Sequence, residues 1–218
     1  MGPELQTATA GAILLGETRL QWMARRSVRR YLPAPIPQDV IDQLLEAAVT
    51  APSAHNRQPW RFAIMSSDRH KTTLARAMGE RLRKDRRGDK NPSADIEADV
   101  ARSFARITGA ATVVIVCLSM EDMDVYPDAV RSHNEHQMAV QSTAMAGQNL
   151  LLAAYAAGLG ACWLCAPMFC PDTVRDALGL PAHWEPQGMI TLGYPADAGK
   201  PFYRRPMSEV AMLLTNAA

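Results

Sequence analysis

The stretch APSAHNRQPWRF, residues 51–62, joins a predicted helix to a predicted strand and carries more polar side chains than such a connection requires. Apolar residues recur on one helical face over residues 37–50, and Pro52 disfavours a continuation of that helix. Residues 61–65 are apolar enough to predict a short strand. Between the two prolines, residues 55–58 read His-Asn-Arg-Gln. Four hydrogen-bonding side chains in a row indicate a binding turn.

The composition of the chain is that of one soluble globular domain. It has 218 residues, of which 48% are hydrophobic and 21% charged. A formal net charge of +1 argues against a broad surface for nucleic acid. The apolar run 138–169 is interrupted by amides and a Gly-Leu-Gly break, which predicts a buried helix and no membrane span. Residues 1–20 resemble no secretory signal, so we expect an N-terminal extension and a cytoplasmic protein.

Helical and strand patterns alternate along the rest of the chain without an internal repeat. Helices are predicted over 68–82, 95–108, 130–157 and 171–178, and strands over 111–118, 161–164 and 187–194. This order predicts a sheet covered by helices on both faces.

The charged stretch RLRKDRRGDKNPSAD, residues 81–95, predicts an exposed loop or lid over about 83–95. Such a charge run is typical of a solvated segment. The alternative is a lid that attracts an anionic substrate.

Two cationic clusters flank the chain, RRSVRRY at residues 25–31 and KPFYRRP at 200–206. Each cluster alone is typical of a solvated face. Arginine binds phosphate bidentately, and asparagine and glutamine amides recognise the edge of a heterocycle. Together with the turn at 52–58, the clusters indicate a site for a phosphorylated heterocyclic ligand.

In order and spacing, four motifs resemble the nitroreductase family of FMN enzymes. They are R-x-S-x-R, P-S-x-x-N-x-Q-P-W, A-G-x-G-A-C-W and the terminal basic pair, and they run from about residue 25 to 210. The resemblance implies one α+β domain over 1–218, a three-layer α-β-α sandwich with a central, mostly antiparallel sheet. It also implies an intertwined homodimer with FMN at the interface. The small-residue helix 130–157 is then an interface element, although a buried helix explains the same pattern.

The resemblance also assigns cofactor contacts. The positions that match the family's motifs are Arg25, Arg26, Ser27, Arg29, Pro52, Ser53, Ala54, Asn56, Gln58, Trp163, Leu164, Cys165, Ala166, Arg204 and Arg205. Arg25 and Ser27 are expected at the phosphate and ribityl chain, with Arg204 or Arg205 completing the phosphate clamp. Arg29 is expected near the N1–C2=O side of the ring, where reduction places negative charge. The backbone of Leu164 and Cys165 is expected at flavin N5. Many family members have Glu-Gly where this chain has Cys165-Ala166.

The function implied is transfer of hydride from NADH or NADPH, through FMN, to a nitroaromatic, quinone or activated alkene by a ping-pong mechanism. Residues 158–196 are also similar to the nitroreductase-like domain of deazaflavin biosynthesis, so a reductase acting on a deazaflavin or its precursor is an alternative. A non-catalytic flavin store or redox sensor is another.

Two further patterns carry weaker hypotheses. Cys162, Cys165 and Cys170, with Cys117, have the residue type of a metal site, but their apolar surroundings favour buried thiols and no metal. The HNEH run at 133–136 is typical of a solvated helix start. In a flavin dimer it alternatively borders the substrate pocket.

Overall fold

Four apolar segments form one sheet in the computed structural model, which describes residues 24–214. The strands are β1 (Trp60–Met65), β2 (Thr112–Leu118), β3 (Gly160–Leu164) and β4 (Glu185–Gly193). Their order in the sheet is β1-β2-β4-β3, and each neighbouring pair is antiparallel. All seven residues of β2 are buried because this central strand is covered on both faces. The four predicted strand regions are confirmed.

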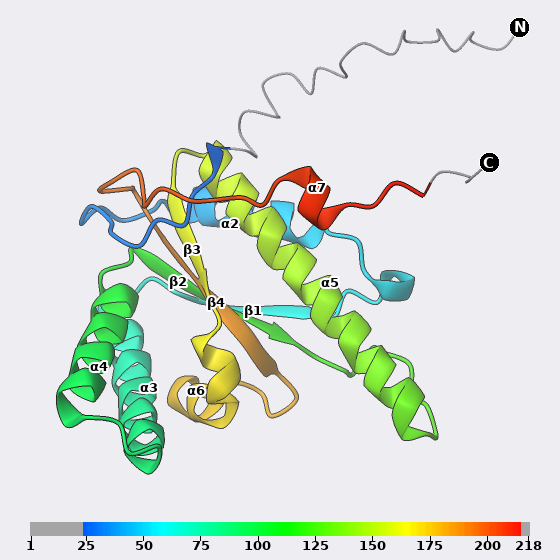
Figure 1. The fold of residues 1–218 in the computed structure, drawn as a ribbon, viewed down its shortest axis with the longest axis horizontal. Helices are drawn as coiled ribbons and strands as arrows, with labels where there is room; N and C mark the ends of the chain where they lie inside the picture. Colours follow the sequence, from blue (N-terminus) through cyan, green and yellow to red (C-terminus); the bar gives the residue numbers. More distant parts are fainter. Residues whose placement is uncertain (1–23, 215–218) are drawn as a thin grey trace, which may run out of the picture.

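Helices cover both faces of the sheet (Figure 1). α2 (Gln38–Val49) and α5 (Ala129–Ala156) lie on one face, whereas α3 (Asp68–Gly88), α4 (Ser93–Thr108) and α6 (Pro171–Leu178) lie on the other. The predicted three-layer α-β-α sandwich is therefore confirmed.

Alternation along β2 builds the two cores. Val114 and Val116 pack against α2 and α5, and Val113 and Ile115 pack against α3, α4 and α6. This follows from the two-residue period of a strand. In α5, Ala139 and Gly147 are buried within the chain, so packing in one subunit already explains part of its small-residue pattern.

The prediction of a loop or lid over about 83–95 is wrong. α3 continues to Gly88, and α4 begins at Ser93 after a short turn. Arg83 binds Glu97 of α4 at 2.9 Å, and Arg86 lies 3.0 Å from Asp99. The charges that suggested a solvated loop therefore join two helices into a hairpin.

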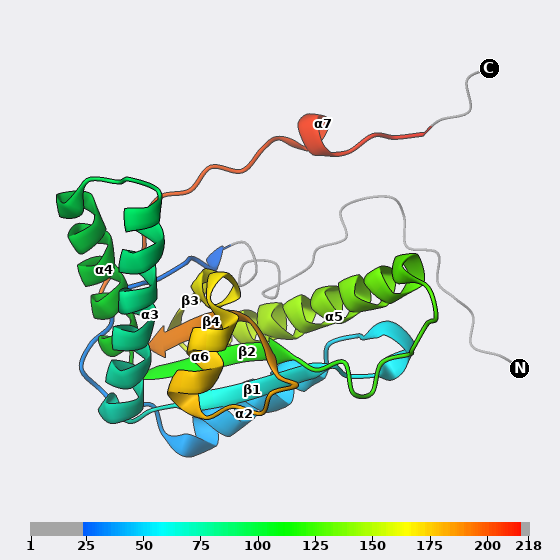
Figure 2. The same ribbon diagram turned by 90° about the horizontal axis from the view of Figure 1, so that it is seen from below.

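The C-terminal segment leaves the body of the chain. Every residue over 201–214 is exposed, and the short helix α7 (Met207–Val210) is its one regular element (Figure 2). Its exposed large apolar side chains are Phe202, Tyr203, Met207, Val210, Met212, Leu213 and Leu214. This many exposed apolar side chains along one segment are typical of an interface.

No helix in the described part of the chain combines the length and the apolar character needed to cross a membrane. The predicted extension over 1–20 lies outside the described residues.

Candidate cofactor site

The N-terminal cationic cluster adds to the free edge of β3. Ser27 pairs with Ala161 in a parallel bridge, and the Val28 amide donates to the Ala161 carbonyl at 3.0 Å. Gly160 leaves room for Val28, since a Cβ at position 160 would lie only 2.8 Å from the Val28 side chain. Tyr31 anchors the end of the segment, since its hydroxyl oxygen lies 2.8 Å from Thr191 Oγ1 on β4. Burial raises the Tyr31 pKa, which keeps this phenol neutral.

A cavity of about 780 Å³ opens between this segment, α4 and the loop 196–200. Its charged lining residues are Arg29, Arg30, Arg102, Arg106, Lys200 and Asp197. Arg30 pairs with Asp197 at 2.6 Å, and Arg102 pairs with Asp99. Within residues 24–214, no carboxylate pairs with the remaining three cations. The cavity is therefore suited to an anion of ligand size.

A second recess of about 300 Å³ lies on the α5 side of the same segment. It is lined by Arg25, Ser27, Trp163 and residues of α5. Ser27 is thus shared by both recesses. Arg25 and Trp163 therefore line the recess on the α5 side, whereas Arg29 lines the larger cavity on the α4 side.

Trp163 is wedged between α5 and β4. A Cβ on Gly147 or on Gly188 would lie 2.5 Å from its ring. Its indole Nε1 donates to Cys165 Sγ at 3.2 Å. The wedge fixes the end of β3, where the chain turns into η2 (Ala166–Phe169).

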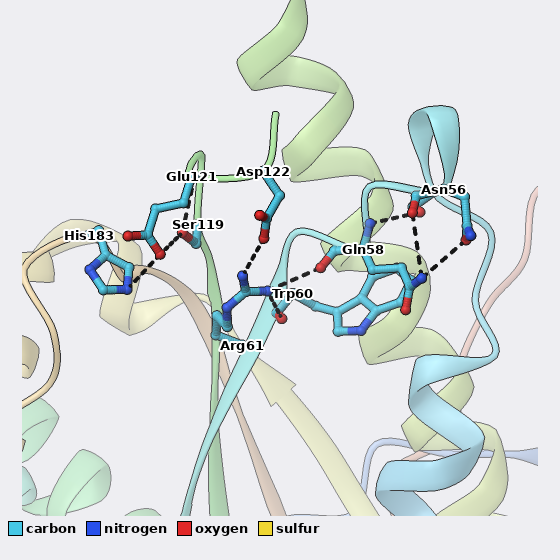
Figure 3. Close-up of polar contacts among 9 residues, drawn as sticks. Asn56, Gln58, Trp60, Arg61, Ser119, Glu121, Asp122 and His183 are labelled. Atoms are coloured by element: carbon cyan, nitrogen blue, oxygen red, sulfur yellow. Dashed lines mark hydrogen bonds and ion pairs between the residues drawn. The ribbon is translucent and has the colours of Figure 1, made fainter. Parts of the chain in front are cut away.

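The polar turn lies at the opposite edge of the sheet, where it contains η1 (Ala54–Asn56) and precedes β1. His55, Asn56 and Gln58 have positive φ angles of 49°, 55° and 50°. Residues other than glycine rarely adopt this conformation, and each costs about 1–3 kcal/mol unless its surroundings enforce it. Figure 3 shows the Gln58 amide directed toward Asn56, with Nε2 3.4 Å from Asn56 Oδ1.

The turn and the N-terminal cluster cannot meet within one chain. Ser27 lies beyond β3, so four strand spacings, roughly 19 Å, separate it from β1. Along the strands, Trp60 lies level with Leu118 of β2, whereas Ala161 lies level with Thr112 of β2. Leu118 and Thr112 are six residues apart, so roughly 20 Å separates the two levels along the sheet. The two halves of the expected cradle are thus on the order of 25 Å apart.

The terminal arginines also lie apart from the cavity lining. The guanidinium groups of Arg26 and Arg204 are 3.7 and 4.1 Å from the ring centroid of Phe202. Arg205 is 3.6 Å from Glu209. Lys200 is the residue of this cluster that lines the cavity.

Arg102 and Arg106 line the cavity and were not predicted from the sequence. They are four residues apart on α4, which is also the pattern of a solvated helix face. The sequence carries no signal that separates the two interpretations, because the loop that faces them is far away in the chain.

The thiols divide into two kinds. Cys117, Cys162 and Cys170 are buried, as predicted, whereas Cys165 is exposed. The buried-thiol prediction is wrong for Cys165 because β3 ends at Leu164. Among residues 24–214, no three histidine, cysteine or acidic side chains are grouped to hold a metal.

Known proteins match this chain over most of its length. The Nitroreductase family model matches residues 22–194, so the chain belongs to the nitroreductase family, as the motifs indicated. An "NADH dehydrogenase" of Thermus thermophilus is 30% identical to this chain, and the match spans 87% of this chain and 92% of the Thermus protein.

Solved structures agree with this membership. A protein of Desulfovibrio desulfuricans, provisionally assigned as a nitroreductase and solved in complex with FMN, is 27% identical, with a TM-score of 0.72. The match covers 93% of this chain and 99% of that one. A BluB-like flavoprotein of Clostridium difficile, at 21% identity and a TM-score of 0.75, shares the fold over 92% of this chain and all of its own.

Proposed function

We propose that this protein uses bound FMN to transfer hydride from NADH or NADPH to a small electron-poor acceptor in two alternating half-reactions. At the coarser level, the family and its relatives support a flavin-dependent NAD(P)H oxidoreductase. The predictions of an enzyme and of FMN with NAD(P)H are confirmed at that level. The acceptor, of the nitroaromatic, quinone or activated alkene class, belongs to the proposal, and the cytoplasmic location stays a prediction.

The observation that carries the proposal is the cationic cavity beside the N-terminal cluster. Arg29, Arg106 and Lys200 lack acidic partners among the described residues. Three cations match the charge of FMN, since its phosphate is a dianion and reduction adds negative charge at the ring. The donor set therefore fits this cofactor.

FMN, when bound, supplies the hydride chemistry. In the cavity, Ser27 and Lys200 would hold the phosphate end, with Arg25 reaching it from the second recess, and Arg29 and Arg106 would stabilise negative charge at the pyrimidine end of the ring. Trp163, packed at the end of β3, would hold the backbone of Leu164 and Cys165 beside the reactive edge. No side chain of the described residues is assigned as a proton donor in this scheme.

The complete site requires a second copy of the chain. The turn over 52–58 lies too far from Ser27 to serve the same flavin within one subunit. The apolar segment 201–214 lacks cover in one chain and supplies a contact surface for a partner. A homodimer in which the turn of one subunit completes the cavity of the other accounts for both features.

The proposal is tested by the visible spectrum of the purified protein before and after addition of NADH or NADPH without oxygen. We expect a yellow protein that one nucleotide bleaches and that an added quinone or nitroaromatic reoxidises. A yellow protein bleached by neither nucleotide would favour the deazaflavin or storage alternatives. A protein that refuses FMN would refute the cofactor assignment.

A further inference from the structure

The loop 119–124, which connects β2 toward α5, is held from both sides. Arg61 at the start of β1 donates to Asp122 at 2.9 Å, and His183 lies 3.0 Å from Glu121 (Figure 3). At its far end, Asp124 pairs with Arg57 of the polar turn. The loop therefore links the turn to the body of the fold.

Glu135 of α5 holds this loop in place. The side chain is 1% exposed, and its Oε1 accepts the Asp124 backbone N–H at 3.1 Å. Its Oε2 is buried without a hydrogen-bond partner among the described residues. A buried carboxylate is costly to maintain. A role for Glu135 beyond core packing accounts for its presence.

Ser142 of α5 holds the same turn directly. It is buried, and its Oγ accepts the Ala54 backbone N–H at 3.3 Å. Residues 135 and 142 are seven positions apart, so they lie two helical turns apart on one face of α5. One helix face thus fixes the turn at two points, directly at Ala54 and through Asp124 at Arg57.

This arrangement explains how the strained turn persists. Three residues with positive φ angles are stable only where surrounding contacts over-determine the backbone. Within the turn, Ser53 accepts hydrogen bonds from the backbone amides of Asn56 and Gln58. From outside it, Ser142 and the chain of contacts from Glu135 through Asp124 to Arg57, the relay, add to that constraint.

We infer that Glu135 is a positioning residue for cofactor binding, which acts through Asp124 and Arg57 on the turn over 52–58. The inference rests on the proposed function, in which this turn contacts FMN. Glu135 itself lies within α5 and does not touch the cofactor. Its effect is transmitted by the backbone hydrogen bond to Asp124 and the ion pair that follows.

The test is a double-mutant cycle on the dissociation constant of FMN, measured by quenching of flavin fluorescence. Glu135→Leu removes the acceptor, and Arg57→Ala removes the other end of the relay. Each is expected to raise the dissociation constant about three- to tenfold, the effect of one hydrogen bond or of one partly exposed ion pair. The double variant is expected to be no worse than either single variant, because both break one relay.

Three further variants isolate the relay from general destabilisation. Glu135→Gln retains a carbonyl acceptor and should bind FMN as the wild type does. Asp124→Ala, a surface change, should reproduce the loss if Glu135→Leu fails to fold. Glu121→Ala removes a carboxylate of the same loop whose pair with His183 is exposed and contributes little, so it should leave FMN binding unchanged.

The outcomes separate the inference from the proposed function. Wild-type protein that does not bind FMN refutes the proposed function. Wild-type protein that binds FMN while Asp124→Ala and Arg57→Ala bind it equally well refutes the relay alone. Strict additivity in the cycle also overturns it.

Discussion

Gly188→Ala tests the packing of Trp163 between α5 and β4, which positions the backbone of Leu164 and Cys165 at the proposed cofactor site. The new Cβ would lie 2.5 Å from Cζ2 and 2.7 Å from Cε2 of the Trp163 ring. The ring cannot retreat toward α5, because Gly147 offers no more room on that side. Overpacking of this kind costs about 1–3 kcal/mol. For a chain of this size, each kcal/mol lowers the midpoint of thermal unfolding by about 2–4 °C, so a fall of about 2–12 °C is expected.

The assay is thermal unfolding of the FMN-free protein, followed by circular dichroism. Gly88→Ala is the matched control, because no atom lies within 4 Å of its added Cβ. Because Gly88 ends α3 without a positive φ angle, this alanine should leave stability unchanged or raise it by up to about 1 kcal/mol. Trp163→Leu should lower the free energy of unfolding less in the Gly188→Ala background than in the wild type, because the smaller side chain leaves room for the new Cβ. An unfolding midpoint for Gly188→Ala equal to that of Gly88→Ala would refute the reasoning.

Three other changes test separate parts of the account. Arg106→Ala should raise the FMN dissociation constant about tenfold, most strongly at low salt, whereas Arg87→Ala should not; equal affinities would remove Arg106 from the site. Burial raises the Cys117 pKa to about 12, so the unfolded chain loses this proton first as pH rises above about 8.5, and stability falls. The unfolding midpoint should therefore drop between pH 8 and 10, and less in Cys117→Ala; identical drops would contradict the assignment. Ellman's reagent should label one thiol quickly, Cys165, and FMN should slow that reaction. Cys165→Ala should abolish the fast phase, and a fast phase that FMN leaves unchanged would place Cys165 away from the cofactor.

The fold could be predicted well from local patterns. Pro52 and Gly158 end their helices where expected, and the continuous apolar run of β2 identified the centre of the sheet. The error at 83–95 arose because the acids that pair with Arg83 and Arg86 lie on α4. Local charge density alone cannot distinguish a solvated loop from a helical hairpin joined by ion pairs.

The candidate site could be predicted only in part. Motif order predicts that the segments around Ser27 and Trp163 and the polar turn belong to one site. Arg102 and Arg106 reach the cavity through packing of α4 against distant residues, which no local pattern encodes. The separation of the turn from Ser27 likewise follows from strand order, which the sequence does not state.

The most direct test of the central claim, a cofactor site shared between two chains, is complementation between two defective variants. One chain carries Arg29→Ala and the other carries Asn56→Ala with Gln58→Ala, each with its own affinity tag. Dimers purified through both tags contain one copy of each. If the site is composite, one of the two sites in each dimer is intact, so FMN content and activity should recover to about half of wild type. Mixed dimers that hold no more FMN than the two parent variants would contradict the account.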